Sequence, residues 1–133
     1  MNPSTVNAAA LIGRILLAAL FVISGFNKIG GFSGVAGYIG SKGLPMPEVL
    51  AALTIALELG GGILLMIGYK ARIVSILFFL WLIPTTLLFH KFWGIDPAQV
   101  QGQMNNFLKN VSIMGAMLLV FAFGPGAYSV DKR

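Results

Sequence analysis

The sequence predicts an all-α membrane protein, a single domain over residues 1–133 that forms an antiparallel four-transmembrane-helix bundle. Apolar residues make up 57% of the chain and charged residues only 10%, whereas a soluble domain has about 25% charged residues. The apolar residues fall into four stretches, and a bilayer core about 30 Å thick needs about 20 helical residues for each crossing. Four spans with short connectors form an up-down bundle, and we expect its helices at about residues 8–29, 47–68, 72–90 and 105–123.

The first helix is expected to end at Gly30-Gly31, because glycine commonly terminates helices. The preceding segment, Met1–Asn7, contains no Lys or Arg, so we expect the apolar stretch to remain as a span and not to act as a cleaved signal peptide. The connector at residues 31–46 is rich in glycine but carries apolar side chains whose spacing suits a short helix or turn in the membrane interface. These side chains are Phe32, Val35, Tyr38 and Ile39.

Pro47 and Glu48 begin the second helix, because proline in a first turn sacrifices no hydrogen bond and an acidic residue favours the positive end of the helix dipole. Gly68 ends this helix, and a tight basic turn at residues 69–72 leads into the third. Pro84 lies inside the third helix, where we expect a kink because proline removes a helical hydrogen bond.

The polar residues 93–103 are expected to form a loop in which Asp96-Pro97 caps one helical turn. The fourth helix follows this loop and ends at Phe123. Its apolar part, Val111–Phe123, has 13 residues, which is too short for a bilayer crossing. The polar turn that precedes this part must therefore also enter the membrane.

The net charge of +5 does not indicate nucleic-acid binding, because the basic residues are scattered singly. The absence of cysteine excludes disulfides and thiolate metal ligands. His90 is the only histidine and the chain has four acidic residues, so we expect no metal site and no intrinsic cofactor.

The count of basic residues hardly decides the orientation in the membrane, because four lie on the side of the termini and four on the opposite side. The two groups are Lys70, Arg72, Lys132 and Arg133 against Lys28, Lys42, Lys91 and Lys109. Lys70 and Arg72 form the only dense loop pair, and cytoplasmic loops carry the excess of Lys and Arg. We therefore expect both termini on the cytoplasmic side.

Polar side chains gather at one end of the predicted bundle, because residues three or four apart share a helix face and three helix ends meet there. The principal candidates for a ligand pocket are Arg14, Lys28, Glu58, His90, Lys109 and Asn110. Additional candidates are Ser24, Asn27, Thr86 and Asn106. We predict a cavity that opens toward the face opposite the termini, with Glu58 at its floor.

Glu58 is the strongest candidate, since charged groups at that depth usually mark a functional site. An isolated carboxylate there would stay protonated, whereas Arg14 would hold it ionised. Helical geometry allows Arg14 and Lys28 to face the bundle axis together. Three interpretations are open: a structural Arg14–Glu58 pair that fixes helix register, a ligand- or proton-handling role, and snorkelling toward a helix end.

The other polar residues also have alternative interpretations. His90 is either a proton carrier or hydrogen-bond donor, or an interfacial histidine beside Lys91. Asn110 either faces a ligand or makes a structural interhelical hydrogen bond. The aromatic residues are expected mainly to face lipid, with one or two available to stack on a flat ligand. The glycines at 60–62 give the second helix a small face for close packing, which would also suit a homodimer.

The polar positions and their flanking residues resemble the pattern of the DoxX family over nearly the whole chain. The matching positions are Gly13-Arg14, Phe21, Ser24-Gly25, Lys28, Leu44-Pro45, Glu58, Gly60-Gly61, Gly68, Arg72, His90, Phe107 and Lys109-Asn110. This resemblance implies a small four-helix protein of the bacterial inner membrane.

The resemblance implies two classes of function, because fold alone does not fix activity. Some relatives are quinone-linked oxidoreductase subunits or are associated with oxidative-stress resistance, so the pocket would bind a quinone, a lipid or a similar amphiphile. Glu58 and His90 would then handle protons, and whether the protein is an enzyme stays open. The wider superfamily also includes a cargo receptor and an assembly chaperone, so the alternative is an assembly factor or partner-binding protein whose buried polar residues are structural.

Overall fold

The computed structural model describes residues 1–133 and is helical throughout, which confirms the predicted fold class. Its elements are α1 (Pro3–Gly30), α2 (Phe32–Ser41), α3 (Pro47–Ile55), the π-helical η1 (Ala56–Gly61), α4 (Gly62–Ile67), α5 (Ala71–Phe89) and α6 (Pro97–Phe123). The segments α3, η1 and α4 follow one another without a break and form a single span, Pro47–Ile67. With α1, α5 and α6, this gives four helices long and apolar enough to cross a membrane.

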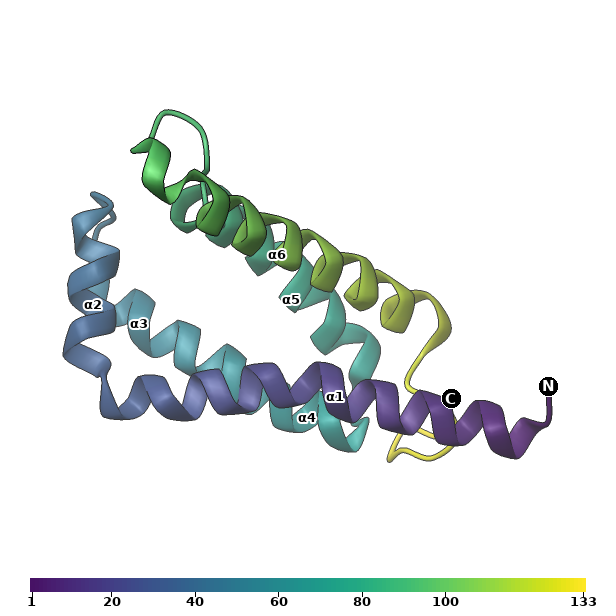
Figure 1. Cartoon of the computed structure of the whole chain (residues 1–133). Coiled ribbons are helices and arrows are strands. Elements are labelled where there is room, and N and C mark those ends of the chain that lie inside the picture. The colour runs from purple at the N-terminus through teal and green to yellow at the C-terminus, as the bar shows by residue number, and fades with distance from the viewer.

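The spans form two antiparallel helical hairpins that diverge from each other (Figure 1). In the first hairpin, α1 packs along η1 and α4, and in the second, α5 packs along α6. Both termini lie at the end of the molecule where the hairpins converge, and α2 stands at the end where they spread apart (Figure 1). The bundle is therefore a wedge, and its wide end is opposite the termini.

The core of the wedge is a cluster of apolar side chains from α1, α4, α5 and α6. Phe78 is fully buried, and its ring centroid lies 4.3 Å from that of Phe21. Leu65 and Met117 are also fully buried and close the core. Many other large apolar side chains point outward, as expected for helices that face lipid and not water.

The short helix expected in the first connector is present as α2, whose buried Ala36 and Ile39 pack against Ala51 of α3. The second span ends as expected at Gly68, which adopts a left-handed conformation with φ of 74°. Pro84 lies inside α5, as predicted, without ending it.

Two helix ends differ from the prediction. The first helix begins at Pro3 and not at residue 8, because the Asn2 side chain accepts a hydrogen bond from Ser4 N–H and caps it. The fourth begins at Pro97 and not at residue 105, so Asp96 caps the whole helix and not an isolated turn. With 27 residues, α6 is about 40 Å long at 1.5 Å per residue and extends beyond the hydrocarbon core.

Two glycines allow α1 and the second span to approach closely. A Cβ atom added to Gly25 would lie 2.7 Å from the backbone nitrogen of Leu59, and one added to Gly62 would lie 2.9 Å from a methyl carbon of Val22. Gly61 is also closely packed, against the ring of Phe78, whereas Gly60 has open space around it. The predicted small face of the second helix is therefore used for packing within the chain at two of its three glycines.

Replacing Gly25 with alanine is expected to destabilise the protein by about 1–3 kcal/mol, because the new methyl group overlaps backbone that cannot move aside easily. Gly13→Ala, on the same helix, is the matched control, since its Cβ atom would meet nothing within 4 Å. Thermal unfolding in detergent, followed by circular dichroism, measures both. Equal melting temperatures for the two variants would show that the close approach at Gly25 is not required.

Candidate functional site

The π-helical segment η1 carries Glu58 toward α1. Glu58 is the twelfth residue of the span Pro47–Ile67 and is only 4% exposed. π-Helical turns inside α-helices are rare and occur frequently at functional sites, because the extra residue redirects the side chains around it. The segment thus places the Glu58 carboxylate within a membrane span, where it faces α1.

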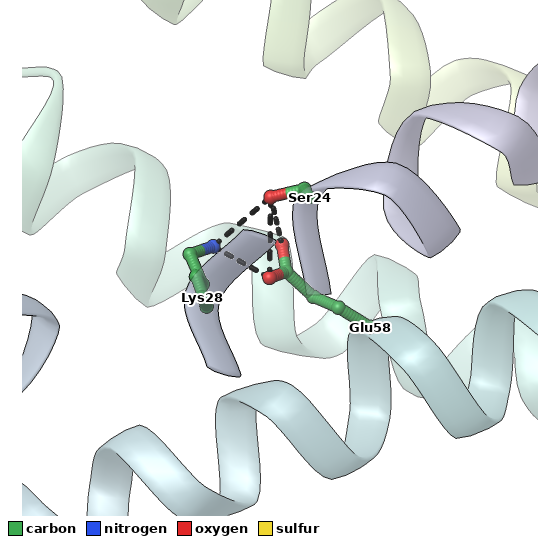
Figure 2. A network of polar contacts seen from close by, with 3 residues as sticks. All are labelled: Ser24, Lys28 and Glu58. Atoms are coloured by element: carbon green, nitrogen blue, oxygen red, sulfur yellow. Dashed lines mark hydrogen bonds and ion pairs between the residues drawn. The ribbon is translucent and has the colours of Figure 1, made fainter. Parts of the chain in front are cut away.

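Glu58 is bound by two residues of α1, and the three side chains form a closed polar network (Figure 2). Lys28 Nζ lies 2.5 Å from Glu58 Oε1 and forms the structure's one ion pair. The Ser24 hydroxyl donates to the same carboxylate at 3.3 Å and accepts a hydrogen bond from Lys28 Nζ at 3.2 Å. Ser24 and Lys28 are four residues apart and therefore share the helix face that Gly25 brings close to η1.

The predicted pairing of Arg14 with Glu58 is wrong. Arg14 lies near the converging end, where its guanidinium donates to three backbone carbonyls: Met66 at 3.3 Å, Pro125 at 2.5 Å and Tyr128 at 3.0 Å. Arg14 and Lys28 are 14 residues apart, which corresponds to a rise of about 21 Å along α1, and Arg14 makes no hydrogen bond or ion pair with Glu58. Arg14 therefore has a structural role at the other end of the bundle.

The residues after α6 provide two of the three carbonyls that bind Arg14, and no sequence pattern predicted their fold. Val130 and Asp131 donate backbone hydrogen bonds to the carbonyls of Ile67 and Gly68 at the end of the second span. The Asp131 carboxylate accepts from the N–H groups of Lys70 and Ala71, each at 2.9 Å, and so caps the start of α5. The C-terminal segment thus ties together the ends of three spans.

The pKa of Asp131 lies below its usual value. Burial alone would raise this pKa, but the hydrogen bonds from the Ala71 and Lys70 N–H groups, together with the positive charges of Arg133 and Arg14, lower it. The depressed pKa means that the charged carboxylate stabilises the fold above about pH 4, the unfolded value, and that this stability is lost as the pH falls further toward the folded value.

Asp131→Asn should therefore cost about 1 kcal/mol at neutral pH, which is typical of a lost helix cap. The difference from the wild type should shrink when the pH falls below about 4, because the wild-type carboxylate is then protonated as well. Melting temperatures measured in detergent from pH 7 to pH 3 test this. A difference that stays constant over the whole range would rule out the charged cap.

A cavity of about 240 Å³ is lined by residues of both hairpins and of α2, the helix that stands at the wide end of the wedge. Six of the predicted site residues line it: Ser24, Lys28, Glu58, His90, Lys109 and Asn110. The remaining four predicted residues lie outside it. Arg14 is at the converging end, Asn27 lines a neighbouring hollow beside Ser24 and Lys28, and neither Thr86 nor Asn106 is among the lining residues.

Some polar side chains of the cavity have hydrogen-bond partners within the protein, and others have none. Asn110 is only 7% exposed, and its side-chain amide makes no hydrogen bond within the protein. Lys109 has no carboxylate partner, because the only ion pair joins Lys28 to Glu58. His90 Nδ1 lies 3.1 Å from Gln103 Oε1, a partner supplied by the part of α6 that was predicted to be a loop. The cavity is thus lined by the buried Asn110 and the exposed Lys109, whose side-chain donors have no partner in the protein.

The walls of the cavity are apolar and aromatic, and they include aromatic residues that the sequence suggested would mainly face lipid. Phe21 comes from α1, Tyr38 from α2, and Trp81 and Phe89 from α5. Tyr38 and Phe89 contact each other, with ring centroids 5.2 Å apart, and so join α2 to the end of α5. The aromatic spacing in the first connector was the available signal for Tyr38.

This arrangement suits the binding of a molecule with a small polar head and a flat or apolar body. Convergent donors from Lys28, Lys109 and Asn110 can bind carbonyl or anionic oxygens, and aromatic walls can contact a ring or a chain. Glu58 and His90 are the groups in the cavity that can exchange a proton. Pockets with apolar walls and a few placed polar groups are typical of small-molecule sites.

Comparison with known proteins identifies one family and two similar inner membrane proteins. The DoxX family model matches residues 9–91. The chain is 40% identical over 123 residues to Inner membrane protein YphA of Escherichia coli strain K12, covering 92% of this chain and 88% of that protein. It is 34% identical to Inner membrane protein YqjF of the same strain, covering 95% of this chain and 92% of the relative. No solved structure gives a significant match.

Proposed function

The chain belongs to the DoxX family of integral membrane proteins, and we propose that in the bacterial inner membrane it binds a quinone-like or similar amphiphile in the cavity at its wide end. The head of this ligand would contact Lys28, Lys109 and Asn110, and its apolar part would lie against the aromatic walls. Its relatives YphA and YqjF are named inner membrane proteins, which supports the location.

The observation that carries the proposal is the position of Asn110, which is only 7% exposed, lines the cavity and makes no side-chain hydrogen bond to the rest of the protein. Leaving a polar group unsatisfied within a membrane costs several kcal/mol, so such groups are retained where a ligand or water completes them. A structural Asn110 would instead bond to a neighbouring helix, and no such bond is present. The unpaired ammonium of Lys109 next to it favours a carbonyl or anionic oxygen as the ligand group.

The two tryptophans of the chain allow a direct binding measurement, because Trp81 lines the cavity and Trp93 does not. In a Trp93→Phe background, Trp81 is the sole tryptophan, and a bound quinone should quench its fluorescence. We expect saturable quenching by a short-tailed benzoquinone in detergent, weakened about tenfold by Asn110→Leu, which corresponds to the loss of one hydrogen bond of about 1.4 kcal/mol.

Lys109→Met should weaken the same binding, and Lys91→Met is its matched control, since Lys91 is exposed and does not line the cavity. Mass spectrometry of compounds that co-purify with the wild type identifies the natural ligand. The absence of both saturable quenching and a co-purified amphiphile would contradict the proposal. The polar residues would then be structural, as expected for an assembly factor or a partner-binding protein.

We also propose that both termini face the cytoplasm, which would place the wide end of the wedge toward the opposite membrane surface. The basic turn at Lys70 and Arg72 supports this orientation. Fusions of alkaline phosphatase and of a fluorescent protein to each terminus test it in intact cells. Fluorescence without phosphatase activity is expected, and phosphatase activity at either terminus would reverse the orientation.

A further inference from the structure

We propose that the converging end of the protein carries a second site, separate from the cavity, which binds the phosphate of an anionic phospholipid. A hollow of about 330 Å³ lies there, lined by Lys70, Arg72, Ile73, Pro125, Asp131 and Arg133. Three separate parts of the chain form it: the turn before α5, the first turn of α5 and the C-terminal segment that folds back over both. The proposal does not depend on the function of the cavity at the wide end, which shares no residue with this hollow.

The charge of the hollow is unbalanced. Lys70, Arg72 and Arg133 contribute three positive charges, and Asp131 is the only acid among the lining residues. No carboxylate lies within ion-pair distance of the three cations, since the single ion pair of the structure is Lys28–Glu58. The Asp131 carboxylate is already engaged by the two N–H groups at the start of α5. Basic side chains therefore outnumber acidic side chains in the hollow, which suits the negative charge of a phosphate group.

The position of the hollow favours a lipid as the source of that phosphate. It lies where α5 begins and α6 has just ended, which is the level of the lipid headgroups for helices of this length. Ile73, which lines the hollow, is 57% exposed, and Phe123, the last residue of α6, is 76% exposed. Both belong to the apolar spans. A phosphate held by Arg72 would thus continue into acyl chains that cover these side chains. Arginine is well suited to this contact, because its planar guanidinium binds phosphate through two hydrogen bonds.

Native mass spectrometry of the full chain in detergent tests the proposal, with phosphatidylglycerol and phosphatidylcholine of identical acyl chains as probes. Because a basic residue near a membrane surface contributes about 1 kcal/mol to the binding of anionic lipid, removing one should reduce the preference for phosphatidylglycerol about fivefold. We expect this reduction for Arg72→Gln and for Arg133→Gln. Both side chains are exposed and make no hydrogen bond, so Arg72→Gln should melt at the wild-type temperature. Arg133→Gln also removes a positive charge that acts on Asp131, so it should melt at or slightly below that temperature.

Lys91→Gln is the matched control, because Lys91 is an exposed cation at the opposite end of the molecule. It should change the preference by less than about twofold, because Lys91 lies outside the hollow in which the three other cations meet. An unchanged preference in both arginine variants, or an equal loss in the control, would overturn the site. Inorganic phosphate is tested as a competitor: no displacement of lipid at millimolar phosphate is expected. Phosphate binding without a preference between the two lipids would assign the hollow to free anions and overturn the lipid proposal.

Discussion

Replacing Arg14 with leucine is expected to lower the free energy of unfolding by about 3–5 kcal/mol, because three carbonyl groups lose their donor at once. Arg14 is only 4% exposed, so water does not readily take its place. The loss should also free the C-terminal segment, since two of the three carbonyls belong to Pro125 and Tyr128. Thermal unfolding in detergent measures the first effect, and proteolysis of the C-terminal segment measures the second. Arg72→Leu is the control, since its exposed side chain makes no hydrogen bond and its loss should cost no more than about 0.5 kcal/mol.

A double-mutant cycle distinguishes this role from the pairing that the sequence suggested. Arg14 and Glu58 share no partner, so the effects of Arg14→Leu and Glu58→Leu should add to within about 0.5 kcal/mol. Partial recovery of stability in the double variant would mean that the two charges interact after all.

Replacing Lys28 with methionine should be the second most damaging change, at about 3 kcal/mol, because it leaves the buried Glu58 carboxylate without its counter-charge. The variant Lys28→Met/Glu58→Leu should recover at least half of this loss, since the double change removes both charges and keeps apolar volume. Melting temperatures of the two single variants and the double variant provide the measurement. Lys42→Met serves as control, because Lys42 is exposed and its ammonium contacts only the ring of Tyr38. A double variant as unstable as the sum of the singles would show that the Lys28–Glu58 contact does not stabilise the fold.

The number of spans and the grouping of polar residues were predictable, because both follow from local sequence. Apolar stretches of sufficient length specify the spans, and the short spacing of Ser24 from Lys28 places both on one helix face. The most informative prediction concerned the fourth helix. Because its apolar part is too short for a crossing, Lys109 and Asn110 were expected to enter the membrane, and both line the cavity in the structure.

Helix ends were less predictable, because polarity marks the boundary of the membrane and not the boundary of the helix. Residues 97–104 carry three glutamines and no apolar run, yet they form the start of α6 ahead of its apolar stretch and supply Gln103 to His90. The partner of Arg14 was not predictable for a different reason. Carbonyl groups occur at every residue, so no residue type identifies which of them will meet a guanidinium. The π-helical turn at Glu58 also has no sequence signature, and it turns this carboxylate toward Lys28.

The dependence of Arg14 on the C-terminal segment has a consequence for the order in which the protein is made. Arg14 and the Pro125 carbonyl are 111 residues apart in the chain, and chains emerge from the ribosome from the N-terminus onward. The first span must therefore enter the bilayer with an arginine whose acceptors have not been synthesised. The Met66 carbonyl becomes available with the second span, but the other two acceptors are missing until the last span is complete. Completion of the C-terminal segment is thus the step that supplies Arg14 with its remaining hydrogen bonds.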